Sequence, residues 1–213
     1  MDEIARDLFC SVIVTGDTRR YCYLIKRSAG NVFVHGLDSK THKMVRGALT
    51  KLGGVQHQVM CHWHEAKHFD PAFYQEHAPE VHVPELERDF IQGLLGGGVK
   101  VSAVRDRVRL LGDLVPYRVS GHSADFTVYQ WRDFVFGGDF MVRRGDKWGS
   151  VFERAHVQSG LRGLDTLRGL RAAHWLPLKS SGTAPVPFAF DAGVIASVEQ
   201  KLRKKWKLPA AER

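Results

Sequence analysis

The sequence predicts an α/β protein in which two β-sheets are covered by helices. Three observations predict this class: the order of the β-prone and helical segments, the glycine-containing turns between them, and the apolar stripes of the helical segments. β-hairpins come first, a helix is inserted, a second group of strands fills the middle, and helices come last. Nothing indicates a separable second domain, so we expect one domain over residues 1–213.

The first third of the chain is predicted to form three strands, a helix and a fourth strand. The strands are Phe9–Val14, Tyr21–Lys26, Asn31–Val34 and Gln58–Cys61. Gly16-Asp17 and Ala29-Gly30 are typical of hairpin turns between the first three. The helix covers Ser39–Leu52, where apolar residues recur at helical spacing and two glycines close the pattern.

The middle of the chain is predicted to be rich in strands, and the last part is predicted to be mainly helical. The middle strands are Glu80–Val83, Val99–Val101, Val108–Leu110, Val115–Val119, Phe126–Tyr129 and Asp133–Phe136. Leucines then recur every three residues from Leu161 to Leu170 and predict a helix. A short strand, His174–Leu178, precedes a final basic helix at about 192–207, whose apolar residues share one stripe.

The composition is that of a soluble globular protein. Of the 213 residues, 44% are hydrophobic and 25% charged, which is enough apolar material for a core. No run approaches the ~18 apolar residues of a membrane span, and the first residues are acidic where a secretory signal is basic. The three cysteines, Cys10, Cys22 and Cys61, lack the paired spacing of a disulfide framework or thiolate metal site. We therefore expect reduced thiols and a cytoplasmic location.

The formal net charge is +8, from 31 Lys plus Arg and 23 Asp plus Glu, with 11 histidines counted as neutral. Much of it lies in Lys201–Lys207 and in Arg105, Arg107 and Arg109, whose alternation is typical of the polar face of a strand. A nucleic-acid patch is one interpretation, and a solvated helix end with a polar strand face is the simpler one. We do not expect a nucleic-acid partner.

Histidines cluster in Val59–Asp70, VMCHWHEAKHFD. His62 and His64 stand two apart after an apolar run, so an extended chain presents both imidazoles on one side. His68 lies one helical turn beyond His64 if the chain coils there. Paired imidazoles suit a divalent zinc or iron ion. The alternative is a polar loop in which histidines occur by chance.

Two later motifs follow the histidine cluster in a definite order. They are GHS at Gly121–Ser123 and GGD at Gly137–Asp139, each placed at the end of a predicted strand. HxH, GHS and GGD in this order resemble the HxHxDH, GHSxG and F-x-GD loops of the metallo-β-lactamase-fold hydrolases. Residues 21–38 and 167–182 resemble the opening hairpin and the closing helix and strand of that family. The resemblance implies an αββα four-layer sandwich.

The resemblance also implies which residues bind metal. His62, His64 and His122 match the three histidines of the first metal, and Asp139 matches the carboxylate that touches it. The ligands of the second metal do not match. Ala66 and Lys67 replace the aspartate and the third histidine of HxHxDH, and Ser181 stands where the closing loop gives a histidine. In addition, Asp125 replaces the glycine of the GHSxG loop. Glu65 and His68 are displaced candidates for that second site. We therefore expect one zinc or iron ion per chain.

The implied function is metal-dependent hydrolysis of a small ester, thioester, lactone or amide by a metal-bound hydroxide. Asp139 is expected to serve catalysis, and Glu65 is the nearest residue that could act as general base. One alternative is a binding or regulatory protein in which the degraded second site marks lost catalysis. Another is an iron-dependent oxidoreductase on the same fold. The substrate is expected to be a small molecule, with the basic charge favouring an anionic one.

Overall fold

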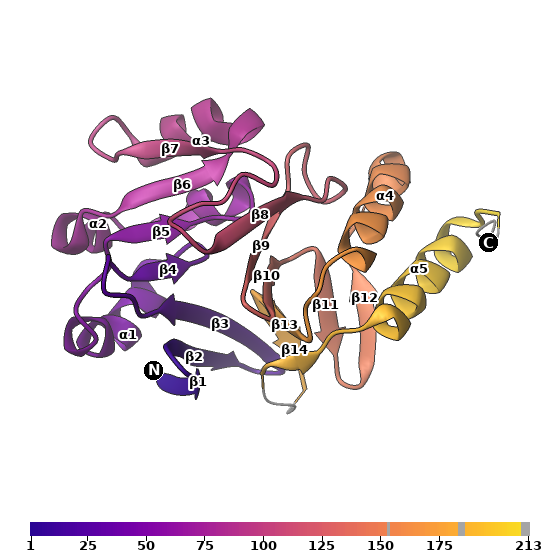
Figure 1. Ribbon diagram of the computed structural model, residues 1–213, viewed down its shortest axis with the longest axis horizontal. Coiled ribbons are helices and arrows are strands. Elements are labelled where there is room, and N and C mark those ends of the chain that lie inside the picture. Colours follow the sequence, from indigo (N-terminus) through magenta and orange to yellow (C-terminus); the bar gives the residue numbers. More distant parts are fainter. Residues whose placement is uncertain (153, 183–185, 210–213) are drawn as a thin grey trace.

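The computed structural model describes residues 1–152, 154–182 and 186–209. Over these residues the chain forms two β-sheets that face each other, with helices on both outer sides, so the layers run αββα (Figure 1). The α/β sandwich expected from the sequence is therefore confirmed.

The larger sheet has ten strands among the described residues and contains most of the first half of the chain. Its order is β12-β11-β14-β3-β4-β5-β6-β7, with β2 also paired to β3 and β1 paired to β2. The strands are β1 (Asp2–Ala5), β2 (Leu8–Thr15), β3 (Thr18–Ile25), β4 (Val32–Val34), β5 (His57–Val59), β6 (Glu80–Pro84), β7 (Val101–Val104), β11 (Met141–Arg144), β12 (Lys147–Ser150) and β14 (Lys179–Ser181). From β4 to β7 neighbouring strands are parallel, so their carboxyl ends lie at one edge of the sheet.

The smaller sheet has the order β15-β13-β10-β9-β8. Its strands are β8 (Leu114–Arg118), β9 (Thr127–Trp131), β10 (Phe134–Gly138), β13 (His174–Pro177) and β15 (Phe188–Ala189). β8, β9 and β10 form an antiparallel meander, and β13 joins β10 in parallel. The loop between β8 and β9 carries GHS, and β10 ends in the two glycines of GGD.

Five α-helices and three short 3₁₀ helices lie within the described residues. The α-helices are α1 (Ser39–Lys51), α2 (Pro71–His77), α3 (Arg88–Leu95), α4 (Val157–Arg168) and α5 (Ala192–Trp206), and the 3₁₀ helices are η1 (Trp63–His68), η2 (Glu85–Glu87) and η3 (Arg154–His156). Asp38, Asp70 and Asp191 precede α1, α2 and α5, and each side chain accepts a hydrogen bond from a backbone N–H of the first turn.

The strands of the larger sheet bury both faces. On β3, Tyr21, Tyr23 and Ile25 pack into the core between the sheets, while Cys22 and Leu24 pack beneath α1. This division follows from the two-residue period of a strand. The central core also takes the apolar stripes of α4 and α5, so it joins both sheets to these two helices. A separate apolar cluster lies under α3.

Most of the predicted elements are present, with shifted ends. The strand predicted at Val108–Leu110 is wrong: β7 ends at Val104, and the chain enters a turn in which Arg107 and Leu111 have positive φ. Arg105, Arg107 and Arg109 therefore lie on a loop rather than on a strand face. Helices α2 and α3 and strands β11, β12 and β14 were not predicted. Across the described part of the chain, every helix is too short or too polar to cross a membrane.

Candidate metal centre

Three histidines from two distant segments meet between the sheets. His62 follows β5 in extended conformation, His64 lies in η1, and His122 lies in the loop between β8 and β9. One ring nitrogen from each lies within 4.8 Å of the others. The ring centroids of His62 are 5.0 Å from those of His64 and 4.8 Å from those of His122. The structure thus brings together the three histidines that the motifs single out.

The local conformation differs from the extended one expected for His62 and His64. Only His62 is extended, with φ −169° and ψ 170°, and the chain turns into η1 at Trp63. The turn, rather than strand alternation, brings the two imidazoles together. It also packs the Trp63 ring against His64, with ring centroids 3.8 Å apart and the planes tilted by 45°.

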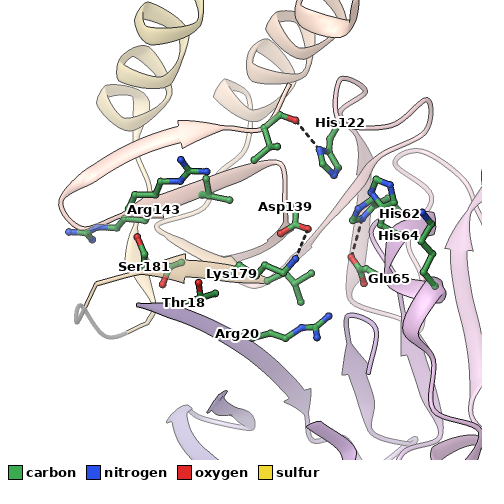
Figure 2. A pocket seen from close by; sticks show the side chains of 16 residues that line it. Thr18, Arg20, His62, His64, Glu65, His122, Asp139, Arg143, Lys179 and Ser181 are labelled. Atoms are coloured by element: carbon green, nitrogen blue, oxygen red, sulfur yellow. Dashed lines mark hydrogen bonds and ion pairs between the residues drawn. The ribbon is translucent and has the colours of Figure 1, made fainter. Parts of the chain in front are cut away.

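His122 is hydrogen-bonded through Nδ1, whereas His62 Nδ1 lies near a carboxylate but has no hydrogen-bond partner among the described residues. His122 Nδ1 donates to the carbonyl oxygen of Val151 at 2.9 Å, and His62 Nδ1 lies 3.3 Å from Glu65 Oε1 (Figure 2). The Nε2 atoms of both rings are buried and have no hydrogen-bond partner in the described structure. The arrangement of His122 is that of a metal-binding histidine, because a partner on one nitrogen fixes the ring while the other nitrogen is left to bind the ion.

Glu65 is buried beneath the histidines rather than free in a loop. Its Oε2 accepts from the backbone N–H of Gly36 at 2.9 Å, and its Oε1 accepts from that of Cys61 at 3.2 Å. His35 Nδ1 lies 3.5 Å from the same Oε1. Burial alone would raise the pKa of Glu65, but His35 and His62 outweigh it and hold that pKa below its ordinary value. The carboxylate is therefore ionised and engaged by its neighbours.

The surroundings of His64 and His122 lower the pKa values of both rings. Burial, with added repulsion from His62 and His122, lowers the pKa of His64 to about 4. Burial also lowers the pKa of His122, although its bond to Val151 acts in the opposite direction. Both imidazoles are neutral at pH 7, which is the form that binds a metal ion.

Asp139 lines the same pocket from the end of β10. It lies outside the tight group of three histidines, and its Oδ2 is 3.7 Å from Lys179 Nζ on β14 (Figure 2). The glycine before it has a φ of +53°, and a Cβ at this position would lie 2.8 Å from Phe126 Cζ. Gly138 thus lets the chain turn tightly enough to direct Asp139 into the pocket.

The other sequence-predicted positions are less central. The backbone of His68 lies in η1, but its side chain falls outside the described residues, so its role as a ligand stays a prediction. Lys67 lines the pocket and packs over the Trp63 ring, with Nζ 4.3 Å from the centroid. Ser181 lines the pocket as well. Asp125 is paired with Arg118 away from the histidines.

The histidines lie in a pocket of about 560 Å³ with a strongly basic lining. Its carboxylates are Glu65 and Asp139. Its cationic side chains are Arg20, Lys67, Arg143, Arg144 and Lys179. Except for Lys67, sequence reasoning missed these cations. They come from β3, β11 and β14, which meet only because of a pairing between segments far apart in the chain.

A second pocket of about 490 Å³ adjoins the first and shares His64, His122 and Arg144 with it. Its far wall contains Trp148 and Lys147 of β12 and Lys205 of α5. The basic C-terminal helix therefore contributes a cation beside the histidine cluster. A ligand that extends beyond the first pocket would meet further positive charge and an indole face.

The donor set suits a divalent transition-metal ion. Two buried Nε2 atoms without partners, a third neutral imidazole and a nearby carboxylate offer three nitrogen donors and one oxygen donor. Zinc and iron both accept such a set. The residues present therefore fit one such ion.

Comparison with known proteins gives a consistent result for the fold. No protein-family model matches the sequence, and no curated protein matches it. Solved structures do match over nearly the whole chain. A metallo-β-lactamase from Pontibacter korlensis is 18% identical, with a TM-score of 0.71 over 95% of this chain and 97% of that one. The DIM-1 metallo-β-lactamase is 15% identical, with a TM-score of 0.72 over 96% of each chain. The chain therefore has the metallo-β-lactamase fold.

Proposed function

We propose that the protein is a metal-dependent hydrolase of a small anionic substrate that contains an ester, thioester, lactone or amide bond. The observation that carries this proposal is the group of three histidines in a pocket lined by five cationic side chains. Solved structures with the same fold are metallo-β-lactamases, and they support the reaction class by analogy.

The chain's own residues divide into ligands and residues that position them. His62, His64 and His122 would hold one ion, with an oxygen of Asp139 completing the set. A divalent ion held in this way lowers the pKa of a bound water to about 7 and polarises the oxygen of the bond to be cleaved.

Glu65 is better placed to position His62 than to act as the general base. Both of its oxygens already accept hydrogen bonds from backbone N–H groups, and His62 Nδ1 is 3.3 Å away. Its low pKa also makes it a weak base. Asp139 is the carboxylate on the open side of the cluster, so we assign to it the orientation of the attacking water.

Lys179 supplies a fixed positive charge beside Asp139. A cation at this position stabilises negative charge as it develops on the substrate oxygen. The resemblance places no ligand set for a second ion here, since Ala66, Lys67 and Ser181 replace its usual ligands. We propose that the ammonium group takes over part of the role of a second ion.

The basic lining favours an anionic substrate. Among the described residues, Lys67, Arg143 and Arg144 form no ion pair with a carboxylate, so their charges remain available to a ligand. Carboxylate and phosphate groups are the anions that such side chains bind.

Metal analysis combined with a substrate panel tests this proposal. Protein purified without added metal is compared with His122→Ala and with His156→Ala, which changes an exposed histidine outside the pocket. We expect His122→Ala to lose one equivalent of metal and all turnover, and His156→Ala to lose neither. The substrate panel contains esters, thioesters, lactones and amides in matched pairs, one member neutral and the other carrying an added carboxylate or phosphate. In each pair the anionic member should have the lower KM. Unchanged metal content in His122→Ala would overturn the assigned site.

A binding or regulatory protein is the second candidate. It is favoured by the ion pair between Asp139 and Lys179, which neutralises the carboxylate that catalysis would use. This candidate predicts that the panel gives no saturable turnover with zinc or iron, while anionic compounds still bind at the pocket. Oxygen consumption on iron loading would instead identify an oxidoreductase. We also propose a reducing compartment such as the cytoplasm, because Cys10, Cys22 and Cys61 are all free and buried.

A further inference from the structure

We propose that the chain carries a second metal site, for zinc, formed by His42, Glu76 and His77 between helices α1 and α2. These helices lie side by side on the outer face of the larger sheet (Figure 1). None of the three residues lines the basic pocket, so this inference does not depend on the proposed hydrolase function.

The donors already form a tight group. One ring nitrogen each from His42 and His77 and one oxygen of Glu76 lie within 4.8 Å of one another. His42 Nε2 is 3.6 Å from Glu76 Oε2, and His77 Nε2 is 4.0 Å from Glu76 Oε1. Shifts of about an ångström would bring all three to bonding distance of one zinc ion, for which ligand bonds are about 2.0–2.2 Å long.

Both imidazoles present a buried nitrogen that has no hydrogen-bond partner among the described residues. The side chains of His42 and His77 are only 4% and 6% exposed, and both Nε2 atoms lack a hydrogen-bond partner in the described part of the chain. Buried polar atoms in native proteins are nearly always paired. Two unpaired nitrogens directed at the same carboxylate therefore point to a bound ion.

Asp70 holds His42 in the orientation that a ligand needs. Asp70 Oδ2 lies 2.7 Å from His42 Nδ1, so Nδ1–H donates to the carboxylate and Nε2 is left as the nitrogen that can bind an ion. Asp70 is itself fixed, because its Oδ1 accepts from Ser39 Oγ at 3.0 Å and from the backbone N–H of Ala72 at 3.2 Å. The Phe73 ring packs against both imidazoles, with centroids 5.5 Å from His42 and 5.1 Å from His77.

The local charge also accommodates a divalent cation. Two carboxylates lie beside the imidazoles, Asp70 and Glu76, and one arginine, Arg46, pairs with Glu76, with its Nε 2.7 Å from Glu76 Oε2. Glu76 Oε1 carries no such partner in the described structure and can bind the ion while Oε2 keeps the arginine. Two imidazoles and a carboxylate favour zinc over calcium or magnesium, which prefer oxygen ligands throughout. Glu76 is 24% exposed, so water can fill the fourth position.

A comparable cluster elsewhere lacks these properties. His57, Glu80 and His82 also lie close together, but His57 Nδ1 and His82 Nε2 are 3.2 Å apart and satisfy each other. Glu80 accepts hydrogen bonds from Lys100 and Ser102. The atoms of His57, Glu80 and His82 that could bind a metal ion are therefore already hydrogen-bonded. For this reason we propose the metal site at the cluster between α1 and α2 instead.

The test is zinc binding in protein whose pocket site has been removed. In a His122→Ala background, equilibrium dialysis against zinc and thermal unfolding with and without zinc are measured for the parent, for His77→Gln and for His156→Gln. His77 is the last residue of α2, so its replacement leaves the helix start and Asp70 intact. His156→Gln makes the same chemical change at an exposed position in η3.

We expect the parent and His156→Gln to bind one equivalent of zinc and to gain several degrees in Tm when zinc is added. His77→Gln should bind no zinc and show no change in Tm, while folding as the parent does without metal. Equal zinc content in His77→Gln and the parent would overturn the site, as would a parent that binds no zinc once His122 is replaced. If His77→Gln fails to fold, Glu76→Gln replaces it in the same comparison, with the same two outcomes.

Discussion

Lys179 is the single side chain that most changes the chemistry open to the pocket. It lies on β14, and Nζ is 3.7 Å from Asp139 Oδ2 (Figure 2). Two metal ions in one site share the stabilisation of attacking and leaving oxygens. One metal ion and the Lys179 ammonium group could stabilise the same two oxygens. The ammonium group is held in place by Asp139 and, unlike a metal ion, cannot dissociate from the site.

We predict that Lys179→Met keeps its full metal content and lowers kcat by about 10²-fold, because a group that stabilises charge in the transition state is lost. Lys179→Arg should recover part of that loss, since it restores the charge with a different geometry. Elemental analysis and steady-state kinetics on the same preparations check both points. An unchanged kcat in Lys179→Met would show that the ammonium has no part in the reaction.

At the level of single residues, the sequence predicts the convergence of the site but not its surroundings. The order of HxH, GHS and GGD is enough to predict that His62, His64 and His122 lie close together, as they do in the structure. The conformation of His64 was not predictable, because a 3₁₀ turn has no hydrophobic period to read. Lys179 and Arg20 were missed, since their approach depends on the pairing of β14 with β3 across more than 150 residues.

At the scale of elements, the loop between β8 and β9 depends on a close approach to α4. Gly121, which precedes His122, has a φ of +142°, and a Cβ there would lie 2.5 Å from Gly160 Cα in α4. A Cβ on Gly160 would in turn meet the Phe152 ring at 2.3 Å. Two glycines therefore let the helix pack directly on the loop that carries the third histidine.

We predict that Gly121→Ala destabilises the protein by about 1–3 kcal/mol, because the residue is strained at this φ and collides with α4 backbone. Metal affinity should fall as well, since a displaced loop moves His122 away from Val151. Urea unfolding and zinc titration measure the two effects. Gly93→Ala in α3 is the control: it has open space and should be neutral or slightly stabilising. Equal stability of the two variants would contradict the packing argument.

The elements that the sequence predicted are those whose pattern is local. Helix α5 was predicted to within a residue of its observed bounds, because one apolar stripe marks it. The start of α2 carries a helix signal in the sequence, an Asp cap followed by proline. The helix has only seven residues, too few to show an apolar period that would support this signal. The strands β11, β12 and β14 are only three or four residues long and lack an apolar alternation, so their extended form comes from partners elsewhere in the sheet.

At the scale of the whole molecule, the parallel strands separate two groups of histidines. The candidate metal centre follows the carboxyl end of β5, whereas His57 is the first residue of β5 and His82 is the middle residue of β6. The second group has no ligand role in our proposals. Its rings are bonded to each other and His82 is only 5% exposed, so its protonation is coupled to the integrity of the sheet.

Stability should therefore fall in mild acid. Burial, reinforced by His57 and Lys100 and opposed by Glu80, lowers the pKa of His82 to about 4, and burial lowers that of His57 too. Unfolded histidine has an ordinary pKa near 6.5, so between pH 6.5 and 4 the unfolded chain binds a proton that the folded chain excludes. The contribution of these two histidines to the free energy of unfolding is present above pH 6.5 and is lost as the pH falls towards 4. For His82 the loss amounts to about 3 kcal/mol.

Urea unfolding of metal-free protein at pH 7, 5.5 and 4.5, compared with His82→Gln, isolates this contribution. The variant starts less stable at pH 7, because Gln replaces a buried, bonded ring, but it has no proton to exclude at this position. The stability difference between the two proteins should thus shrink steadily with acidification, while the carboxylates and the histidines other than His57, the partner of His82, affect both alike. Parallel stability curves would mean that His82 is protonated as readily in the folded sheet as in the unfolded chain, and that its burial has no pH-dependent cost.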